Sequence, residues 1–524
     1  MLLLTAPAQH IAQNPAVECD PKRVKHWLAS LPGNDVQATV SQLVTALKPF
    51  NELQLDAKSR LKLLELYHAA FETTLSTFDE LHLRALPLDY AQRRRLSEDI
   101  MWVYLELANG YKSLVKAVYE GGDEKPSQED ILLSIYRGIE LIANALIYAY
   151  RDHQTPPPLV YLEIHQLYYL AEQYQLESKT IGGLKQQVRN PTIVHLYKKI
   201  MLLIAGGAYA YDGSQLNELY ELLEQYTGDT MLQRELNVNE KASSFFLDFT
   251  EDQIPRSCLK ITSENLLPTQ RILVISQAVQ HIIADLNKGK HTPLDSIRGT
   301  ELRLLRSFIT NLQQGCMIRE QRQPRGDLAR IAYGIESVCY YLEHRDRFLE
   351  NSVEVMDGIE VRDMDIFETE HELLQWQVAN ATPNGRLLVA EEADNTHLRV
   401  GEIVSIVEEL TAQSEPLIHT GFIRWLRYTE DKILMGFEII AGSPIAVRCK
   451  PLFADADEAS EFGALYFPSN KATKKASSLL FEFDQFRQAE KFKVEVSRHT
   501  YRIQPIKIVN ESPVHIQFGF RIIN

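Results

Sequence analysis

Hydrophobic residues recur at three- and four-residue spacings from about residue 35 to about residue 315. One such stripe consists of Leu61, Leu64, Tyr67, His68 and Phe71, and similar stripes begin at Ile100 and Ile131. This spacing is typical of amphipathic helices that bury one face. Proline and glycine clusters such as 156–158 and 206–207 interrupt the stripes. Long helices with short connections favour antiparallel helix hairpins.

The helical part fits two arrangements, a repeat array or an irregular bundle. Residues 160–172 have the alternation of large and small side chains that is typical of a tetratricopeptide-like helix. No fixed period surrounds this segment, and a repeat array requires one. Both arrangements therefore stay open.

From about residue 373 the pattern changes to short alternating runs rich in β-branched residues. The runs cover 387–389, 403–407, 421–426, 433–440, 478–481, 492–496, 501–503 and 514–520. Turn-forming residues separate most of them, which is typical of a small antiparallel barrel or sandwich.

We therefore expect an α+β multidomain protein, with an all-α N-terminal bundle or helical array followed by an antiparallel β-barrel. The expected parts are an N-terminal segment (1–34), a helical domain (35–315), a barrel (316–450) and additional strands that extend or follow it (451–524). An acidic insertion near 351–372 interrupts the barrel segment. Eight acidic residues and the single base Arg362 lie between Glu354 and Glu372, a composition typical of a solvated loop.

Composition and charge narrow the function classes. The chain has 524 residues, of which 45% are hydrophobic and 24% charged, and its formal net charge is −15. An acidic protein is poorly suited to coat nucleic acid or to adsorb to an anionic membrane. The N-terminus lacks the basic region of a signal peptide, and no run of about 18 uncharged apolar residues predicts a membrane span.

The five cysteines are far apart and form no CxxC pair. We expect reduced thiols in a cytoplasmic protein. The sequence shows no motif for a catalytic nucleophile, a metal site or a nucleotide-binding loop, so we expect neither an enzyme nor a bound cofactor.

Several residues in the β-rich part occur in an informative order. They are Asn380, Thr382 and Gly385, then Gly401, then Arg424 and Trp425, and finally Gly436. This order resembles the PilZ domain, a bacterial β-barrel that binds cyclic di-GMP and carries a [D/N]xSxxG motif. Thr382 stands here in place of the family's serine. The resemblance covers roughly Cys316 to Lys450, and a helical region before such a barrel also resembles some bacterial PilZ-containing proteins.

The PilZ family also carries an RxxxR motif before its first strand. In this sequence Gln321 stands at the first position and Arg325 at the second, with Arg322 and Arg319 nearby. The resemblance implies one set of residues that bind cyclic di-GMP and a second set that are accessory to the binding. The binding residues are Arg322, Arg325, Asn380, Thr382 and Gly385, and the accessory residues are Arg319, Arg424 and Trp425. Arginine suits such a ligand because its guanidinium binds phosphate in a fork and stacks on bases.

Two functions follow as alternatives. In the first, the PilZ-like barrel binds cyclic di-GMP and the helical region contacts an unidentified protein partner. In the second, the barrel has lost its ligand and the protein is a scaffold that acts only through protein contacts. The degenerate arginine motif and the acidic insertion motivate the second alternative.

Overall fold

A computed structural model of the protein divides into two compact units. The helical unit comprises Met1–Ala208, Gly213–Ile283 and Phe308–Ile318, and the barrel unit comprises Tyr209–Asp212, Ala284–Ser307 and Arg319–Asn524. The structure describes residues 2–10, 17–33, 35–83, 90–121, 126–182, 190–261, 266–288, 300–317, 322–344, 373–391, 398–408, 417–429, 431–452, 460–469, 476–496 and 499–523.

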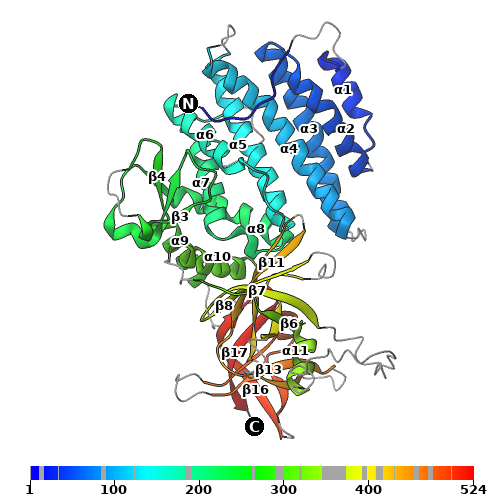
Figure 1. Ribbon diagram of the computed structural model, residues 1–524, viewed down its shortest axis with the longest axis vertical. Coiled ribbons are helices and arrows are strands. Elements are labelled where there is room, and N and C mark those ends of the chain that lie inside the picture. Colours follow the sequence, from blue (N-terminus) through cyan, green and yellow to red (C-terminus); the bar gives the residue numbers. More distant parts are fainter. Residues whose placement is uncertain are drawn as a thin grey trace. The chain divides into compact units, whose positions relative to one another are not determined.

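The helical unit contains most of the helices, several of which lie side by side in Figure 1. They are α1 (Pro21–Ala29), α2 (Val36–Glu52), α3 (Ala57–Leu83), α4 (Tyr90–Tyr119), α5 (Gln128–Arg151), α6 (Val160–Gln173), α7 (Ile193–Ala205), α8 (Gly213–Leu222) and α9 (Ser276–Asn287). The last residues of α9, from Ala284 on, belong to the barrel unit, and α10 (Thr300–Cys316) begins in the barrel unit and ends in the helical unit. The expected N-terminal segment 1–34 thus already contains one helix.

Helix α5 forms the centre of the helical unit. Ser127 and Asp130 cap its start reciprocally, which satisfies two backbone donors that have no partner within the helix. The helix is long and apolar enough to cross a membrane, but 67% of its most apolar window is buried inside the protein. It packs against α4, α6 and α7. We therefore interpret α5 as the core helix of this unit.

A four-stranded sheet lies within the stretch that we expected to be helical. Its strands are β1 (Met231–Gln233), β2 (Ser244–Asp248), β3 (Arg256–Ser257) and β4 (Gln270–Val274), in the order β1-β4-β2-β3. The expectation of helices throughout 35–315 is therefore wrong for this region. Short apolar runs such as Phe245–Leu247 are too brief to show whether their period is that of a helix or a strand.

The first barrel is built by antiparallel strands in the order β5-β7-β6-β9-β10-β11-β8. A further pairing of β7 with β8 closes six of them into a ring, and β5 adds to the edge of β7. The elements are β5 (Gln323–Pro324), β6 (Leu328–Tyr333), α11 (Ile335–Glu343), β7 (Leu374–Thr382), β8 (Gly385–Glu391), β9 (Ile403–Glu408), β10 (Leu417–Tyr428) and β11 (Lys432–Ile439).

The second barrel is closed in the order β12-β13-β14-β17-β16-β15. Its elements are β12 (Ile445–Pro451), β13 (Phe462–Phe467), β14 (Ser478–Glu482), α13 (Phe483–Gln488), β15 (Phe492–Val496), β16 (His499–Glu511) and β17 (His515–Ile523). The aromatic rings of Phe481, Phe492 and Phe518 meet in its core. The strands after residue 451 thus form a separate barrel together with β12. The expected fold class, helices followed by antiparallel barrel structure, is confirmed.

The two barrels share a hydrophobic cluster that includes Val338 of α11, Phe422 of β10 and Leu480 of β14. Beside this cluster Gly401 approaches Pro513 of the second barrel. A Cβ atom at Gly401 would lie 2.5 Å from the Pro513 Cδ atom, and the φ angle of Gly401 is +84°. Glycine is therefore required here both by backbone conformation and by space.

We expect Gly401→Ala to lower the thermal unfolding midpoint of the barrel unit more than Gly334→Ala does. Gly334 has the same φ of +84°, but a Cβ atom at Gly334 would meet no other atom within 4 Å. The unusual backbone conformation alone lowers stability by about 1–3 kcal/mol when alanine replaces either glycine. The collision with Pro513 lowers stability further only in the Gly401→Ala variant. Differential scanning calorimetry of both variants measures the difference. Equal midpoints would show that the barrels do not meet closely at Gly401.

Candidate functional site

Two motifs that are far apart in the sequence meet on strand β7. Strand β5 pairs with β7 so that Pro324 lies opposite Asn380 and Gln323 lies opposite Ala381. The Arg325 backbone N–H donates to the carbonyl oxygen of Ala379 at 3.0 Å. The candidate arginine segment therefore runs alongside the candidate Asn380–Gly385 turn.

A row of opposing residues crosses the first barrel through this point. It runs from Pro324 on β5 through Asn380, Leu387 and Gly436 to Trp425 on β10. Directly opposed residues lie on the same face of a sheet. The next row contains Thr382, Gly385, Glu438 and Phe422.

These two rows lie on the outside of the barrel. Asn380, Leu387 and Trp425 are half-buried, whereas Leu388 and Met435 on the opposite face are fully buried. Side chains alternate between the two faces along β5, and Pro324 lies on the outer face. Arg322 therefore falls on the outer face and Arg325 on the inner face. We call the outer residues Arg322, Asn380, Thr382, Gly385, Arg424 and Trp425 the outer row site.

The indole of Trp425 lies directly on Gly436. A Cβ atom at position 436 would lie 2.0 Å from the Trp425 Nε1 atom, so only glycine leaves room for the ring. Arg424 occupies a bulge between β10 and β11 and forms an ion pair with Glu438. Its guanidinium lies 5.5 Å from the centroid of the Phe422 ring. An aromatic ring and a guanidinium are thus held together on this face.

On the inner face, Arg325 joins a cluster of charged residues, which we call the mouth cluster. It consists of Arg325, Asp327, Arg386, Glu408 and His419. The Arg325 Nε atom lies 2.6 Å from the Asp327 Oδ2 atom, and its Nη2 atom lies 3.8 Å from the Glu408 Oε2 atom. The side chain of Glu408 is only 1% exposed.

Arg386 connects the mouth cluster to the candidate turn. Its Nε donates to the Glu408 carboxylate at 2.5 Å, and its Nη1 donates to the carbonyl oxygens of Thr382 at 2.7 Å and Gly385 at 3.0 Å. Its Nη2 lies 3.3 Å from the His419 Nε2 atom. Arg386 therefore fixes the conformation of the hairpin that presents Thr382.

The structure brings together most of the residues that the sequence singled out. Arg322 is exposed and forms no ion pair with any residue in the described ranges, and Arg325 is paired on the inner face. Arg319 and the acidic run 354–372 lie outside the described residues. Arg386, Glu408 and His419 were not among the residues that the sequence pattern singled out. Only Arg386 had a local signal, because it directly follows Gly385.

No metal site is evident in the part of the chain that the structure describes, since no three His, Cys, Asp or Glu side chains there are grouped to hold an ion. The cysteines are free. Burial raises the pKa of Cys258 and of Cys339 to about 12, so both thiols are protonated and unreactive at neutral pH.

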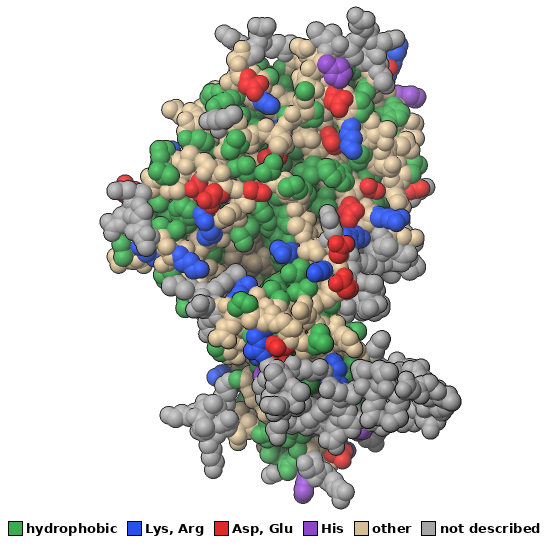
Figure 2. Space-filling model, viewed as in Figure 1, with side chains coloured by type: hydrophobic (Ala, Val, Ile, Leu, Met, Phe, Trp, Pro, Cys, Tyr) green, Lys and Arg blue, Asp and Glu red, His purple; other side chains and the backbone are tan. Residues whose placement is uncertain are grey.

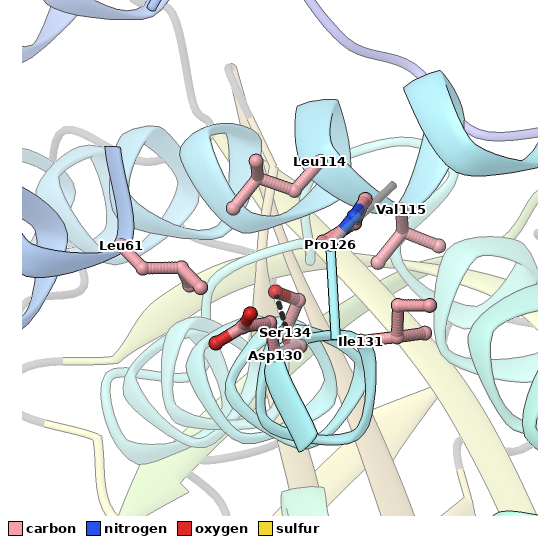
Figure 3. Close-up of a pocket in the computed structure, with 7 residues that line it drawn as sticks. All are labelled: Leu61, Leu114, Val115, Pro126, Asp130, Ile131 and Ser134. Atoms are coloured by element: carbon pink, nitrogen blue, oxygen red, sulfur yellow. Dashed lines mark hydrogen bonds between the residues drawn. The ribbon is translucent and has the colours of Figure 1, made fainter. Parts of the chain in front are cut away.

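One hollow lies in the helical unit between α3, α4 and α5 (Figure 3). It has no room for even a water-sized molecule, so it offers no ligand site. The Ser134 hydroxyl donates to the Asp130 carbonyl oxygen at 2.7 Å within α5. The lining residues are Leu61, Leu114, Val115, Pro126, Asp130, Ile131 and Ser134.

The surface of the helical unit in Figure 2 carries interspersed acidic and basic side chains among hydrophobic ones. On the face shown there, the described residues form no patch of a single charge over this unit. The concentration of arginines with aromatic and amide side chains belongs to the first barrel instead.

The fold and site thus define a two-part α+β protein whose first barrel presents a candidate ligand-binding face. Residues 22–236 match the family model described as "Cyclic-di-GMP receptor FimW, N-terminal domain". The chain is also 33% identical over 159 residues to the cyclic-di-GMP receptor FimW of Pseudomonas aeruginosa. That stretch is 30% of this chain and 26% of the relative, so the match spans about a quarter of the relative's length.

We expect the pKa of His419 to fall further in a Glu408→Gln variant. Burial and the neighbouring Arg386 lower the pKa of His419, whereas the Glu408 carboxylate opposes this shift. Removing that negative charge leaves only the two lowering effects. NMR titration of the imidazole resonances measures the change. His515, whose burial lowers its pKa to about 4 in the second barrel, serves as the unchanged control. A rise for His419 would contradict its contact with Glu408.

Proposed function

We propose that this protein is a bacterial cyclic di-GMP receptor whose first barrel, a PilZ-like domain, binds the dinucleotide between the outer row site and Arg325 of the neighbouring mouth cluster. Arg322 and Arg325 would contact its phosphates, and Asn380, Thr382 and Gly385 would contact its phosphates or guanine edges. Arg424 and Trp425 would contribute as accessory residues.

The chemistry of the outer row site suits a cyclic dinucleotide. Arginine binds phosphate oxygens in a bidentate way and stacks on bases. A half-exposed indole provides a surface on which a purine can stack, as aromatic side chains do for single-stranded nucleic acids. Gly385 carries no side chain beside Thr382, and Gly436 leaves the room that the Trp425 indole occupies.

The observation that carries the proposal is the pairing of β5 with β7. It places the arginine segment beside Asn380 and Thr382, although the two segments are separated in the chain by a helix and the acidic run. The relative from Pseudomonas aeruginosa is a cyclic-di-GMP receptor, which supports the same ligand. The matching family model covers residues that belong to the helical unit except for Tyr209–Asp212, and it leaves the strands of both barrels outside.

The helical unit would then contact a protein partner, and ligand binding would regulate that contact. Such an effector needs no catalytic step, and the proposal includes no enzymatic activity and no cofactor. Free cysteines agree with a cytoplasmic location, which is part of the proposal.

A scaffold that binds no dinucleotide is the second candidate, and one observation favours it. The charge of Arg325 is already balanced by Asp327 and lies near Glu408. With Gln321 in place of the first motif arginine, the phosphate-binding capacity of this segment is reduced.

Isothermal titration of the full chain with cyclic di-GMP separates the two candidates. We expect binding that weakens roughly tenfold or more in Arg322→Ala and Arg325→Ala, because a hydrogen bond to a charged group contributes about 1.5–3 kcal/mol. Asn380→Ala should weaken it less. Arg502→Ala removes an exposed arginine from β16 of the second barrel and should bind normally. Absence of heat at high ligand concentration, or equal loss in the control, would support the scaffold.

A further inference from the structure

We propose that the Glu408 carboxylate competes with a ligand phosphate for Arg325. This buried carboxylate would then set how tightly the site binds a phosphate-bearing molecule. The inference rests on the proposed function, because it concerns regulation of the same site.

Glu408 is placed inside the barrel by its strand. It is the last residue of β9, and alternation puts its side chain on the same face as the fully buried Val404 and Ile406. On either side of β9 it lies opposite Ala329 of β6 and Leu417 of β10. With 1% exposure, the carboxylate is shielded from solvent.

The charges around Glu408 are unevenly shared. Arg386 makes the shortest contact with the carboxylate, 2.5 Å from its Nε atom, whereas the His419 Nε2 atom lies 3.6 Å away and the Arg325 Nη2 atom 3.8 Å away. The carbonyl oxygens of the hairpin hold Arg386 in place. Asp327 already balances the positive charge of Arg325, since the Asp327 Oδ2 atom lies 2.6 Å from the Arg325 Nε atom. The approach of Glu408 to within 3.8 Å of Arg325 therefore adds a second negative charge to an arginine that is already paired.

A ligand phosphate at Arg325 would meet both carboxylates. Repulsion between like charges is strong where solvent is excluded, so the buried Glu408 opposes the anion more than its distance alone suggests. Asp327 is 22% exposed and is better screened. Glu408 thus acts as the larger obstacle, and Asp327 as the smaller one.

The test compares Glu408→Gln with the unaltered chain. Glutamine keeps the size of the side chain and an oxygen that accepts from Arg386, but removes the charge. We expect cyclic di-GMP to bind roughly tenfold more tightly, the effect of about one unit of pKa in electrostatic interaction. Asp327→Asn, at the half-buried acid, should change affinity in the same direction by less.

Two controls define the cause. Glu495→Gln makes the same change in net charge at an exposed position of β15 in the second barrel and should leave affinity unchanged. The double variant Glu408→Gln, Arg325→Ala should lose the gain, because the competitor acts through Arg325. A gain that persists without Arg325 overturns the inference.

A second probe, inorganic pyrophosphate, separates this inference from the proposed function. If cyclic di-GMP binds the unaltered chain but binds Glu408→Gln no more tightly, the inference about Glu408 is overturned and the proposed receptor function is supported. If cyclic di-GMP binds neither form but pyrophosphate binds the variant more tightly, the inference about Glu408 is supported and the proposed receptor function is overturned. If neither probe distinguishes the variant, and Asp327→Asn also has no effect, the competitor is overturned.

Discussion

Strand β7 pairs on both of its edges, and the first barrel depends on this double pairing. On one edge it forms a hairpin with β8, with a register shift between Val378 and Asn380. On the other edge it pairs first with β6 and then with β5. The ring closes through these pairings, and the same pairings set the arginine segment beside the hairpin. A shift of one residue would send every side chain of β7 to the other face.

The same strands separate two environments within a short distance. The outer face carries half-exposed polar and aromatic groups around Trp425, whereas the inner face holds the ion pair of Arg386 and Glu408. Burying two charges is costly unless further hydrogen bonds satisfy them. Arg386 meets this requirement by donating to the carbonyl oxygens of Thr382 and Gly385. The hydrogen bonds that offset the burial of the charges therefore also hold the candidate binding turn in its conformation.

The part of the chain that matches the family model and the part that holds the candidate ligand-binding residues are different. The match to the receptor's N-terminal domain falls in the helical unit, which contains many buried apolar residues. The residues suited to a dinucleotide lie in the first barrel.

The helices and most strands could be predicted from the sequence, because the period of apolar residues is a local property: the stripe from Leu61 and the run 403–407 both formed as expected. The sequence also identified Asn380 and Arg325 as candidates. The pairing of β5 with β7, the approach of Glu408 to Arg325 and the sheet within residues 231–274 became visible only in the folded chain. These features depend on which strands pair across the closed ring and on burial, and neither is encoded in neighbouring residues.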